Sequence, residues 1–323
     1  DYRYAWVRDM ALCGLAIAKA APDARVLGDW TAFVRDRVLE DGAKLAPAYT
    51  VNCDRLPDPT ELPLPGYPGG RVVVGNRVRD QFQLDGLGET LLLFAAAAKA
   101  DRLDADGWRA AVLTADAIAQ RWQEPDGGFW ELDPSWWTES RLTCVAGLRA
   151  IATAGGPETF VAECTSLADT VMAETARRCS HPSGRFQRAP DDERVDAAIL
   201  LALVRGAVAP DDPRVAATIA AVRGELAVDG YVYRYHPEEG PLGEAEGAFL
   251  MCGFAMSLAE HAQGNPVASA RWFERTRSGC GPPGLFSEEF DVDERQLRGN
   301  LPQAFVHALL LEAAAVQTEQ PVT

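Results

Sequence analysis

The stretch AFVHALLLEAAAV, residues Ala304–Val316, is apolar on nearly every face of a helix. Such a helix has no side to turn toward water, so it must be buried all the way round. Five other segments share this pattern, and the sequence therefore predicts six buried inner helices. The other five are Met10–Lys19, Leu84–Lys99, Leu142–Ala154, Val195–Val204 and Phe249–Ala259.

Between these segments lie stretches with one apolar stripe and one charged face, the pattern of helices that cover a core. Little of the chain alternates with a period of two residues, so few strands are expected. The sequence predicts an all-α protein with five amphipathic outer helices. They are Trp30–Leu39, Trp108–Trp122, Phe160–Arg177, Val215–Leu226 and Ala268–Arg277.

Helix hairpins with buried inner and amphipathic outer members, repeated around a ring, form an (α/α)6 barrel, a six-hairpin toroid. A solenoid would show the same local alternation, so closure of the ring rests on the structure. Six inner helices need six outer ones, and we expect the missing outer helix to lie upstream of Asp1 or to be replaced by a linker. The barrel is predicted as one domain over residues 1–318, followed by a C-terminal tail over 319–323.

The loops alternate as well. The turn after each inner helix is short and polar, as in APDAR and AGGPE, whereas the segment before each inner helix is rich in Trp, Tyr, Arg and acids. Functional residues concentrate on loops that a rigid scaffold holds in place. All the rich loops enter the same end of the inner helices, so one end of the barrel is predicted to carry the site.

The net charge of -16 repels phosphate backbones, and no block of Lys and Arg interleaved with aromatics reverses it locally. We therefore expect no nucleic-acid partner. No run of about 18 uncharged apolar residues marks a membrane span, and no signal peptide is visible. The chain starts without Met, within what reads as a functional motif, so we expect an upstream segment or domain, which leaves a signal peptide open.

Seven cysteines are scattered without a CxxC pair, which favours reduced thiols and a cytoplasmic location. The four histidines lack metal-ligand spacing, so neither a metal centre nor a cofactor is predicted. A terpene cyclase on a related helical toroid needs an Asp-rich metal motif. The nearest string, DDERV, has Val195 where the DDxxD pattern requires Asp.

Five segments, taken in order, resemble the landmark segments of glycoside hydrolase family 15. This family includes glucoamylases, related exo-acting α-glucosidases and some bacterial trehalases. The resemblance runs from the first residue to about Ala315. The segments are DYRYAWVRD, GNRVRDQFQLDGLGE, EPDGGFWEL, DGYVYRYHPEEG followed by EGAFLMCGF, and GLFSEEFD followed by QLRGNLPQAFVHALLLEAA.

The resemblance implies an (α/α)6 barrel and an inverting mechanism that removes glucose from a non-reducing end. It implies that Glu131, after Trp130, is the general acid and that Glu288 is the general base. Inversion needs both, since the leaving oxygen takes up a proton while a water on the opposite face of the sugar loses one. Trp130, with Trp136 or Trp137, is expected to desolvate Glu131 and keep it protonated, while Glu288 stays ionised in a wetter setting.

Simpler explanations exist for these acids. Glu131 could be an N-terminal helix residue stabilised by the helix dipole, before the segment that starts near Leu142. Glu288 and Glu289 could be a solvated pair in a loop. The family pattern selects Glu288, and Glu289 is then expected to tune the base or to contact a sugar hydroxyl.

The resemblance also implies sugar-binding residues. Arg8 and Asp9, after Trp6, are expected to grip the terminal glucose, because charged donors and acceptors bind vicinal hydroxyls strongly. The alternative is a local salt bridge. Arg234 is expected to bind substrate, against a structural pairing, and Tyr2 to lie near the catalytic water. Trp6, Trp130 and Tyr235 are expected to stack on sugar faces, although aromatics at a helix mouth often only pack.

Two positions depart from the family pattern: Glu139 stands where we expect His, and Leu87 where relatives often carry Tyr. The first puts the leaving-group side of the pocket in question. The sequence favours an inverting exo-acting α-glucosidase of glucoamylase type acting on α-glucosidic oligo- or polysaccharides. A trehalase of the same family, and a non-catalytic or repurposed barrel that handles a glycosylated metabolite, are the alternatives.

Overall fold

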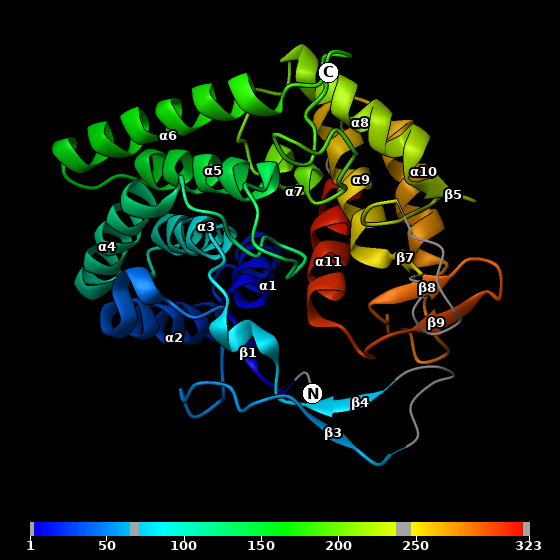
Figure 1. Cartoon of the computed structure of the whole chain (residues 1–323), viewed down its shortest axis with the longest axis horizontal. Helices are drawn as coiled ribbons and strands as arrows, with labels where there is room; N and C mark the ends of the chain where they lie inside the picture. The colour runs from blue at the N-terminus through cyan, green and yellow to red at the C-terminus, as the bar shows by residue number, and fades with distance from the viewer. Residues whose placement is uncertain (1–2, 65–70, 237–246, 319–323) are drawn as a thin grey trace.

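The computed structural model describes residues 3–64, 71–236 and 247–318. Its inner helices form a closed ring, because each packs against the next and the last also packs against the first. Figure 1 shows this ring from one end of the barrel. The toroid is confirmed over the solenoid. The inner helices are α1 (Val7–Ala20), α3 (Asp85–Lys99), α5 (Thr138–Ala154), α7 (Ile199–Val204), α9 (Leu250–Ala262) and α11 (Ala304–Thr318).

Each outer helix packs against the inner ring, beside at least one of the inner helices that flank it in sequence. Their number among the described residues matches the prediction. No outer helix in this part of the chain covers the seam between α1 and α11, where the barrel would take its sixth. The outer helices are α2 (Arg25–Asp41), α4 (Ala105–Arg121), α6 (Glu158–Cys179), α8 (Pro213–Glu225) and α10 (Pro266–Arg277).

The inner helices α3 and α5 approach each other through glycines. A Cβ on Gly88 would lie 2.6 Å from the backbone of Thr143, and a Cβ on Gly147 would lie 2.3 Å from the carbonyl oxygen of Gly88. Atoms cannot come this close, so neither position accepts a side chain without moving a helix. This contact brings α3 and α5 close together along their lengths.

Short antiparallel strands and two 3-10 helices, η1 (Gly42–Lys44) and η2 (Arg77–Asp80), lie in the loops that precede the inner helices. The strands span two or three residues, too few for a period-two pattern to reveal them. They pair as β1 (Ala5–Trp6) with β2 (Ala48–Tyr49), β3 (Thr60–Leu62) with β4 (Val72–Val74), β5 (Ala227–Val228) with β6 (Tyr231–Val232), and β7 (Ala248–Phe249) with β8 (Glu289–Asp291) and β9 (Gln296–Arg298).

Among the described residues, no helix combines the length and apolarity that a membrane crossing requires. All seven cysteines are unpaired, and Cys144, Cys164, Cys179 and Cys252 are buried. These four buried thiols pack in the hydrophobic core.

Candidate active site

Arg8 lies at the centre of a group of residues that it bonds: Asp9, Phe129 and Glu131. It is in the first turn of α1, and its side chain is only 8% exposed. Its Nη1 donates to the carbonyl oxygen of Phe129 at 2.7 Å, and its Nε donates to Asp9 Oδ1 at 2.9 Å. Burial opposes the positive charge, but the nearby carboxylates of Asp9, Glu131 and Asp85 outweigh it and raise the pKa of the guanidinium above its ordinary value. Arg8 therefore stays charged and ties α1 to the loop before α5.

Glu131 lies in that loop, between α4 and α5. Its Oε1 accepts a hydrogen bond from Trp6 Nε1 at 2.9 Å and one from Arg8 Nη2 at 3.4 Å. Its backbone is left-handed, with φ of +59°. The helix α5 begins at Thr138, so the interpretation of Glu131 as a residue of a helix N-terminus is wrong. The acid in the first turn of that helix is Glu139.

A buried ion pair fixes the loop that carries Glu131. Asp126 and Arg141 are fully buried and bonded to each other. Asp126 Oδ1 also accepts from the backbone N–H of Gly128 and the hydroxyl of Ser140, both at 2.8 Å. A buried charge is tolerated when it is paired and hydrogen-bonded in this way. The loop is therefore anchored at its start, five residues before Glu131.

The second candidate acid, Glu288, immediately precedes β8, the central strand of the β7–β8–β9 sheet. Its Oε2 accepts from Asn300 Nδ2 at 2.9 Å, and its backbone N–H donates to the Asn300 carbonyl at 3.0 Å. The next residue, Glu289, pairs with Phe249 and Arg298 in the sheet, and its Oε2 accepts from the Gly247 N–H at 2.8 Å. Burial raises the pKa of Glu289.

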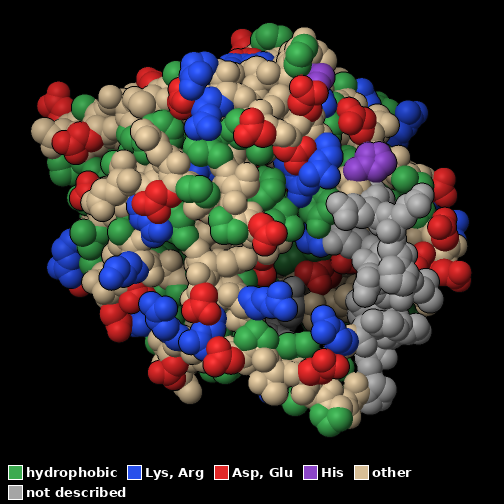
Figure 2. All heavy atoms as spheres, in the orientation of Figure 1, with side chains coloured by type: hydrophobic (Ala, Val, Ile, Leu, Met, Phe, Trp, Pro, Cys, Tyr) green, Lys and Arg blue, Asp and Glu red, His purple; other side chains and the backbone are tan. Residues whose placement is uncertain are grey.

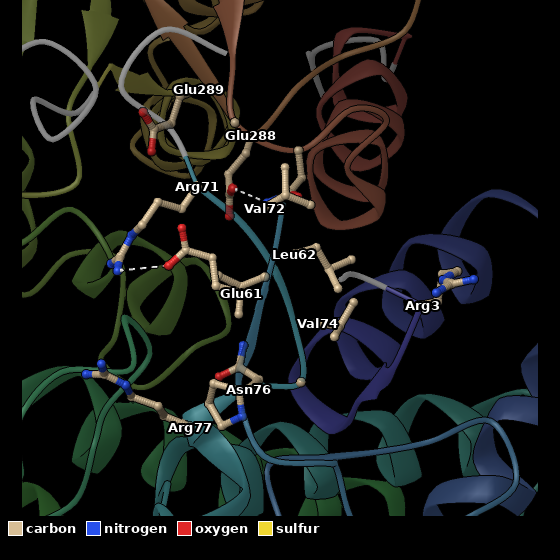
Figure 3. Close-up of a pocket in the computed structure, with 15 residues that line it drawn as sticks. Arg3, Glu61, Leu62, Arg71, Val72, Val74, Asn76, Arg77, Glu288 and Glu289 are labelled. Atoms are coloured by element: carbon tan, nitrogen blue, oxygen red, sulfur yellow. Dashed lines mark hydrogen bonds and ion pairs between the residues drawn. The ribbon is translucent and has the colours of Figure 1, made fainter. Parts of the chain in front are cut away.

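Glu288 and Glu289 line a pocket of about 980 Å³ together with Asn300 and the β3–β4 hairpin. Figure 3 shows the two glutamates on one side of this pocket and Asn76 and Arg77 on the other. Seen from this end, the surface is hollowed, with acidic side chains in the hollow and basic ones at its rim (Figure 2). Pockets that bind small molecules in proteins typically have volumes of about 300–1,000 Å³, so this one is large enough for such a ligand.

Glu131 lines a second cavity, of about 420 Å³, with Gln81, Leu132 and Asp133. Asn76 and Arg77 line both cavities, so the hollow of Glu131 adjoins that of Glu288. Asp9 connects the two electrostatically, because both glutamates add to the rise that burial causes in its pKa. The structure thus brings Glu131 and Glu288, which are far apart in sequence, to adjoining hollows at one end of the barrel.

Arg234 and Tyr235 belong to a neighbouring aromatic cluster. The Arg234 guanidinium lies 4.9 Å from the Tyr235 ring centroid, 5.2 Å from that of Phe249 and 5.6 Å from that of Trp130. Arg234 also acts on Glu289, whose pKa it lowers against the effect of burial. Arg234 therefore joins this cluster to the pocket of Glu288.

Trp130 is 8% exposed and packs edge-to-face against Phe129 and Phe249. Its indole N–H donates to Asp196 Oδ1 at 2.8 Å. These contacts favour packing over sugar stacking. The tryptophan whose N–H meets the Glu131 carboxylate is Trp6, which the sequence analysis assigned only to sugar stacking. Tyr2, the expected neighbour of the catalytic water, lies outside the described residues.

Several buried acids that are not among the predicted site residues lie beneath the site. Asp85 and Glu89, one turn apart on α3, are at most 1% exposed, and burial raises the pKa of Asp85 to about 7 and that of Glu89 to about 8. Both oxygens of Asp85 and Oε2 of Glu89 lack a hydrogen-bond partner among the described residues. Burial also raises the pKa of Glu139 well above its usual range. Acids at i and i+4 in an otherwise apolar helix were the signal for Asp85 and Glu89.

Comparison with known proteins gives a consistent result. The sequence profile of "Glycosyl hydrolases family 15" matches residues 1–315. The chain is 32% identical to a trehalase of Mycobacterium tuberculosis, over 97% of this chain and 48% of the relative. It is 29% identical to trehalase 1 of Sulfolobus acidocaldarius, over 97% and 56%. The chain therefore spans about half the length of the curated relatives it matches.

Solved structures share the fold. A protein described as a wild-type glycosidase superposes with a TM-score of 0.78 at 20% identity, over 98% of this chain and 88% of the other. A bacterial glucoamylase complexed with acarbose also gives 0.78, at 17% identity, over 98% and 49%. At these identities the likeness concerns the barrel alone.

Proposed function

Because the chain belongs to glycosyl hydrolase family 15, we propose that it is an inverting α-glucosidase and that trehalose is its substrate. The observation that carries the catalytic part is the placement of Glu131 and Glu288 on adjoining hollows at one end of the barrel. An acid and a base acting from different sides of a sugar ring need this kind of arrangement.

In this proposal Glu131 is the general acid. Both of its hydrogen bonds go to Oε1, from Trp6 and Arg8. Oε2 is therefore the oxygen available to carry a proton to the glycosidic oxygen. As that proton is transferred, the bond between the anomeric carbon and the glycosidic oxygen breaks and the second sugar departs.

Glu288 is the general base. Its Oε2 is held by Asn300, and its carboxylate faces the large pocket. It takes one proton from a water molecule while the water oxygen bonds to the anomeric carbon on the face opposite the departing sugar. Attack from that face inverts the anomeric configuration. In this proposal Arg8 and Asp9, which are bonded to each other beside Glu131, bind hydroxyls of the reacting glucose, and Glu289 and Arg234 border the base.

The relatives support trehalose as the substrate. The sequence alone favours a glucoamylase-type activity over a trehalase, but the curated relatives that match are trehalases. The match to a glucoamylase structure, at 17% identity, supports the fold and adds nothing on the substrate. Glu139, which departs from the family pattern, is buried under the loop of Glu131 and lines a small cavity with Trp130 and Asp196, not the large pocket.

Initial rates on trehalose, maltose and isomaltose test the proposal. We expect kcat/KM for trehalose to exceed that for either of the other disaccharides at least tenfold. A higher kcat/KM for maltose than for trehalose would favour the glucoamylase-type activity instead. Binding of glucose, seen by calorimetry, without turnover of any disaccharide would favour the non-catalytic barrel.

A further inference from the structure

Gln81 lies between η2 and α3, and its side chain reaches the turn that carries Glu131. Its Nε2 donates to the carbonyl oxygens of Glu131 and of Leu132, each at 3.2 Å. Its Oε1 accepts from Gln83 Nε2, also at 3.2 Å. A side-chain amide has two donors on one nitrogen, so it can hold two adjacent carbonyls at once. Gln81 also lines the same cavity as Glu131.

The turn at Glu131 needs such support. With φ of +59°, the residue is in the left-handed region, which is unfavourable for a residue with a Cβ and persists only where the surroundings hold it. The turn's own bonds run from Glu131 N–H to the Gly128 carbonyl and from Leu132 N–H to the Gly127 carbonyl. Gln81 satisfies the carbonyls of Glu131 and Leu132, which these bonds leave free.

The Gln81 side chain can approach the turn because residue 127 is a glycine. A Cβ at that position would lie 2.8 Å from Gln81 Oε1 and 3.0 Å from its Cδ. The glycine therefore lets the amide reach the turn. The Gln81 side chain, the glycine and the left-handed residue form one local unit.

We propose that Gln81 is a positioning residue for the general acid. By holding two carbonyls it fixes the left-handed turn, and the turn directs the Glu131 carboxylate toward Trp6 and Arg8, with Oε2 left for the substrate. This inference rests on the proposed function, in which Glu131 supplies the proton. Gln81 acts through Glu131 and is assigned no contact with a reacting atom.

The leaving group gives a selective test. A departing sugar needs a proton from the acid, so its release depends on the position of Glu131. Fluoride leaves without such help. With α-D-glucosyl fluoride, the bond from the anomeric carbon to fluorine breaks, the water oxygen takes its place, and Glu288 still accepts the proton of the water. Loss of acid positioning therefore slows the disaccharide and spares the fluoride.

The experiment compares Gln81→Met with the unchanged full chain on both substrates, the disaccharide being trehalose or maltose, whichever is hydrolysed faster. Met has a similar length and no donor. We expect kcat for the disaccharide to fall 10- to 100-fold, since small misplacements of catalytic groups have effects of this size. KM and the kcat for α-D-glucosyl fluoride should each change less than threefold.

Three further variants complete the design. Gln81→Glu keeps the bond from Gln83, loses both donors, and should show the same selective loss if Gln81→Met fails to fold. Gln263→Met is the matched control, because Gln263 also donates to a carbonyl, that of Pro210 at 2.7 Å, but after α9, outside both cavities. It should leave both rates unchanged. Glu131→Gln is the reference for a lost acid.

The outcomes separate the two proposals. If Glu131→Gln spares the fluoride and both Gln81 variants behave like the unchanged chain, or lose both substrates equally, the role of Gln81 is wrong and the proposed function stands. If Glu131→Gln loses both substrates equally, Glu131 is not the acid, and both proposals fall.

Discussion

The two candidate catalytic carboxylates are held in different ways. Glu131 is in a left-handed turn, and its carboxylate is tied by side chains from distant parts of the chain, Trp6 and Arg8. The Glu288 carboxylate accepts a hydrogen bond from the side chain of Asn300, and its backbone bonds to the backbone of Asn300 and of Leu250 beside the three-stranded sheet. We therefore expect the position of the Glu131 carboxylate to depend mainly on single side chains around it, and the position of the Glu288 carboxylate to depend mainly on the backbone conformation.

Replacing each carboxylate gives the largest effect. Glu131→Gln and Glu288→Gln should each lower kcat on the best disaccharide by about 10²- to 10⁴-fold, since each removes a proton-transfer group. Steady-state kinetics measure the loss, and circular dichroism shows whether the fold is kept. A folded Glu288→Gln variant with full activity would show that Glu288 is not the general base.

Arg8→Ala tests how much the positive charge beside Glu131 contributes to the stability of the fold. It leaves Asp9 and Glu131 without their shared cation in a buried setting, so we expect the free energy of unfolding to fall by about 3–5 kcal/mol. Urea denaturation measures this. A loss under about 1 kcal/mol would mean that the cluster is solvated and that side-chain contacts do not define this region.

The buried acids beneath Glu131 predict a pH dependence. The folded pKa of Asp85, about 7, and that of Glu89, about 8, exceed their ordinary values near 4, so the folded state binds more protons. Stability from these groups is complete below about pH 4 and is lost as the pH rises toward 8, by an amount on the order of a few kcal/mol. Asp85→Asn with Glu89→Gln should flatten the stability curve over this range. An unchanged curve would show that other groups cause the slope.

Trp6→Phe and Asn300→Ala compare the two side chains that bond the carboxylates. Each removes one hydrogen bond to a candidate catalytic carboxyl group; such a bond is worth about 0.5–1.5 kcal/mol, or about 1.5–3 kcal/mol where the group is charged. We expect kcat to fall tenfold or more for Trp6→Phe and less than tenfold for Asn300→Ala, because the backbone continues to hold Glu288. Equal losses would contradict the proposed difference.

Gly299→Ala tests the backbone on the base's side and should give the smallest change in stability, about 1–2 kcal/mol. Gly299 has φ of +72°, and an added Cβ would lie 3.1 Å from Glu288 Oε2. We expect kcat to fall severalfold as the carboxylate shifts. Gly284→Ala is the matched control, because Gly284 also has a positive φ but open space at its Cβ. It should lower stability and leave kcat unchanged.

The inner helices could be predicted from the sequence because they are apolar on all sides. The predicted starts of α3, α9 and α11 agree with the structure to within one residue, whereas those of α1, α5 and α7 are three or four residues away. The helix α5 begins at Thr138, four residues before the predicted start at Leu142. The predicted start is late because the residues between these two positions are polar and resemble a loop. Ser140 and Arg141 are nevertheless buried, because both bond to Asp126. Tertiary pairing of this kind leaves no periodic signal.

The site shows the same division. Glu131, Glu288, Arg8 and Asp9 follow from local motifs that resemble the family. The bond from Trp6 to Glu131 joins residues 125 positions apart, and the role of Gln81 depends on the backbone angle of another residue. No local sequence pattern predicts either contact, because each depends on how distant segments of the chain come together in the folded barrel.

Proton NMR of the sugars first released from trehalose tests the central claim most directly. Trehalose joins two α-glucosyl units, and inversion by Glu131 and Glu288 changes only the unit attacked by water. We predict that α- and β-glucose appear in equal amounts before mutarotation mixes them. Release of α-glucose alone would mean retention, and would contradict the action of these two carboxylates as an acid and a base in a single displacement.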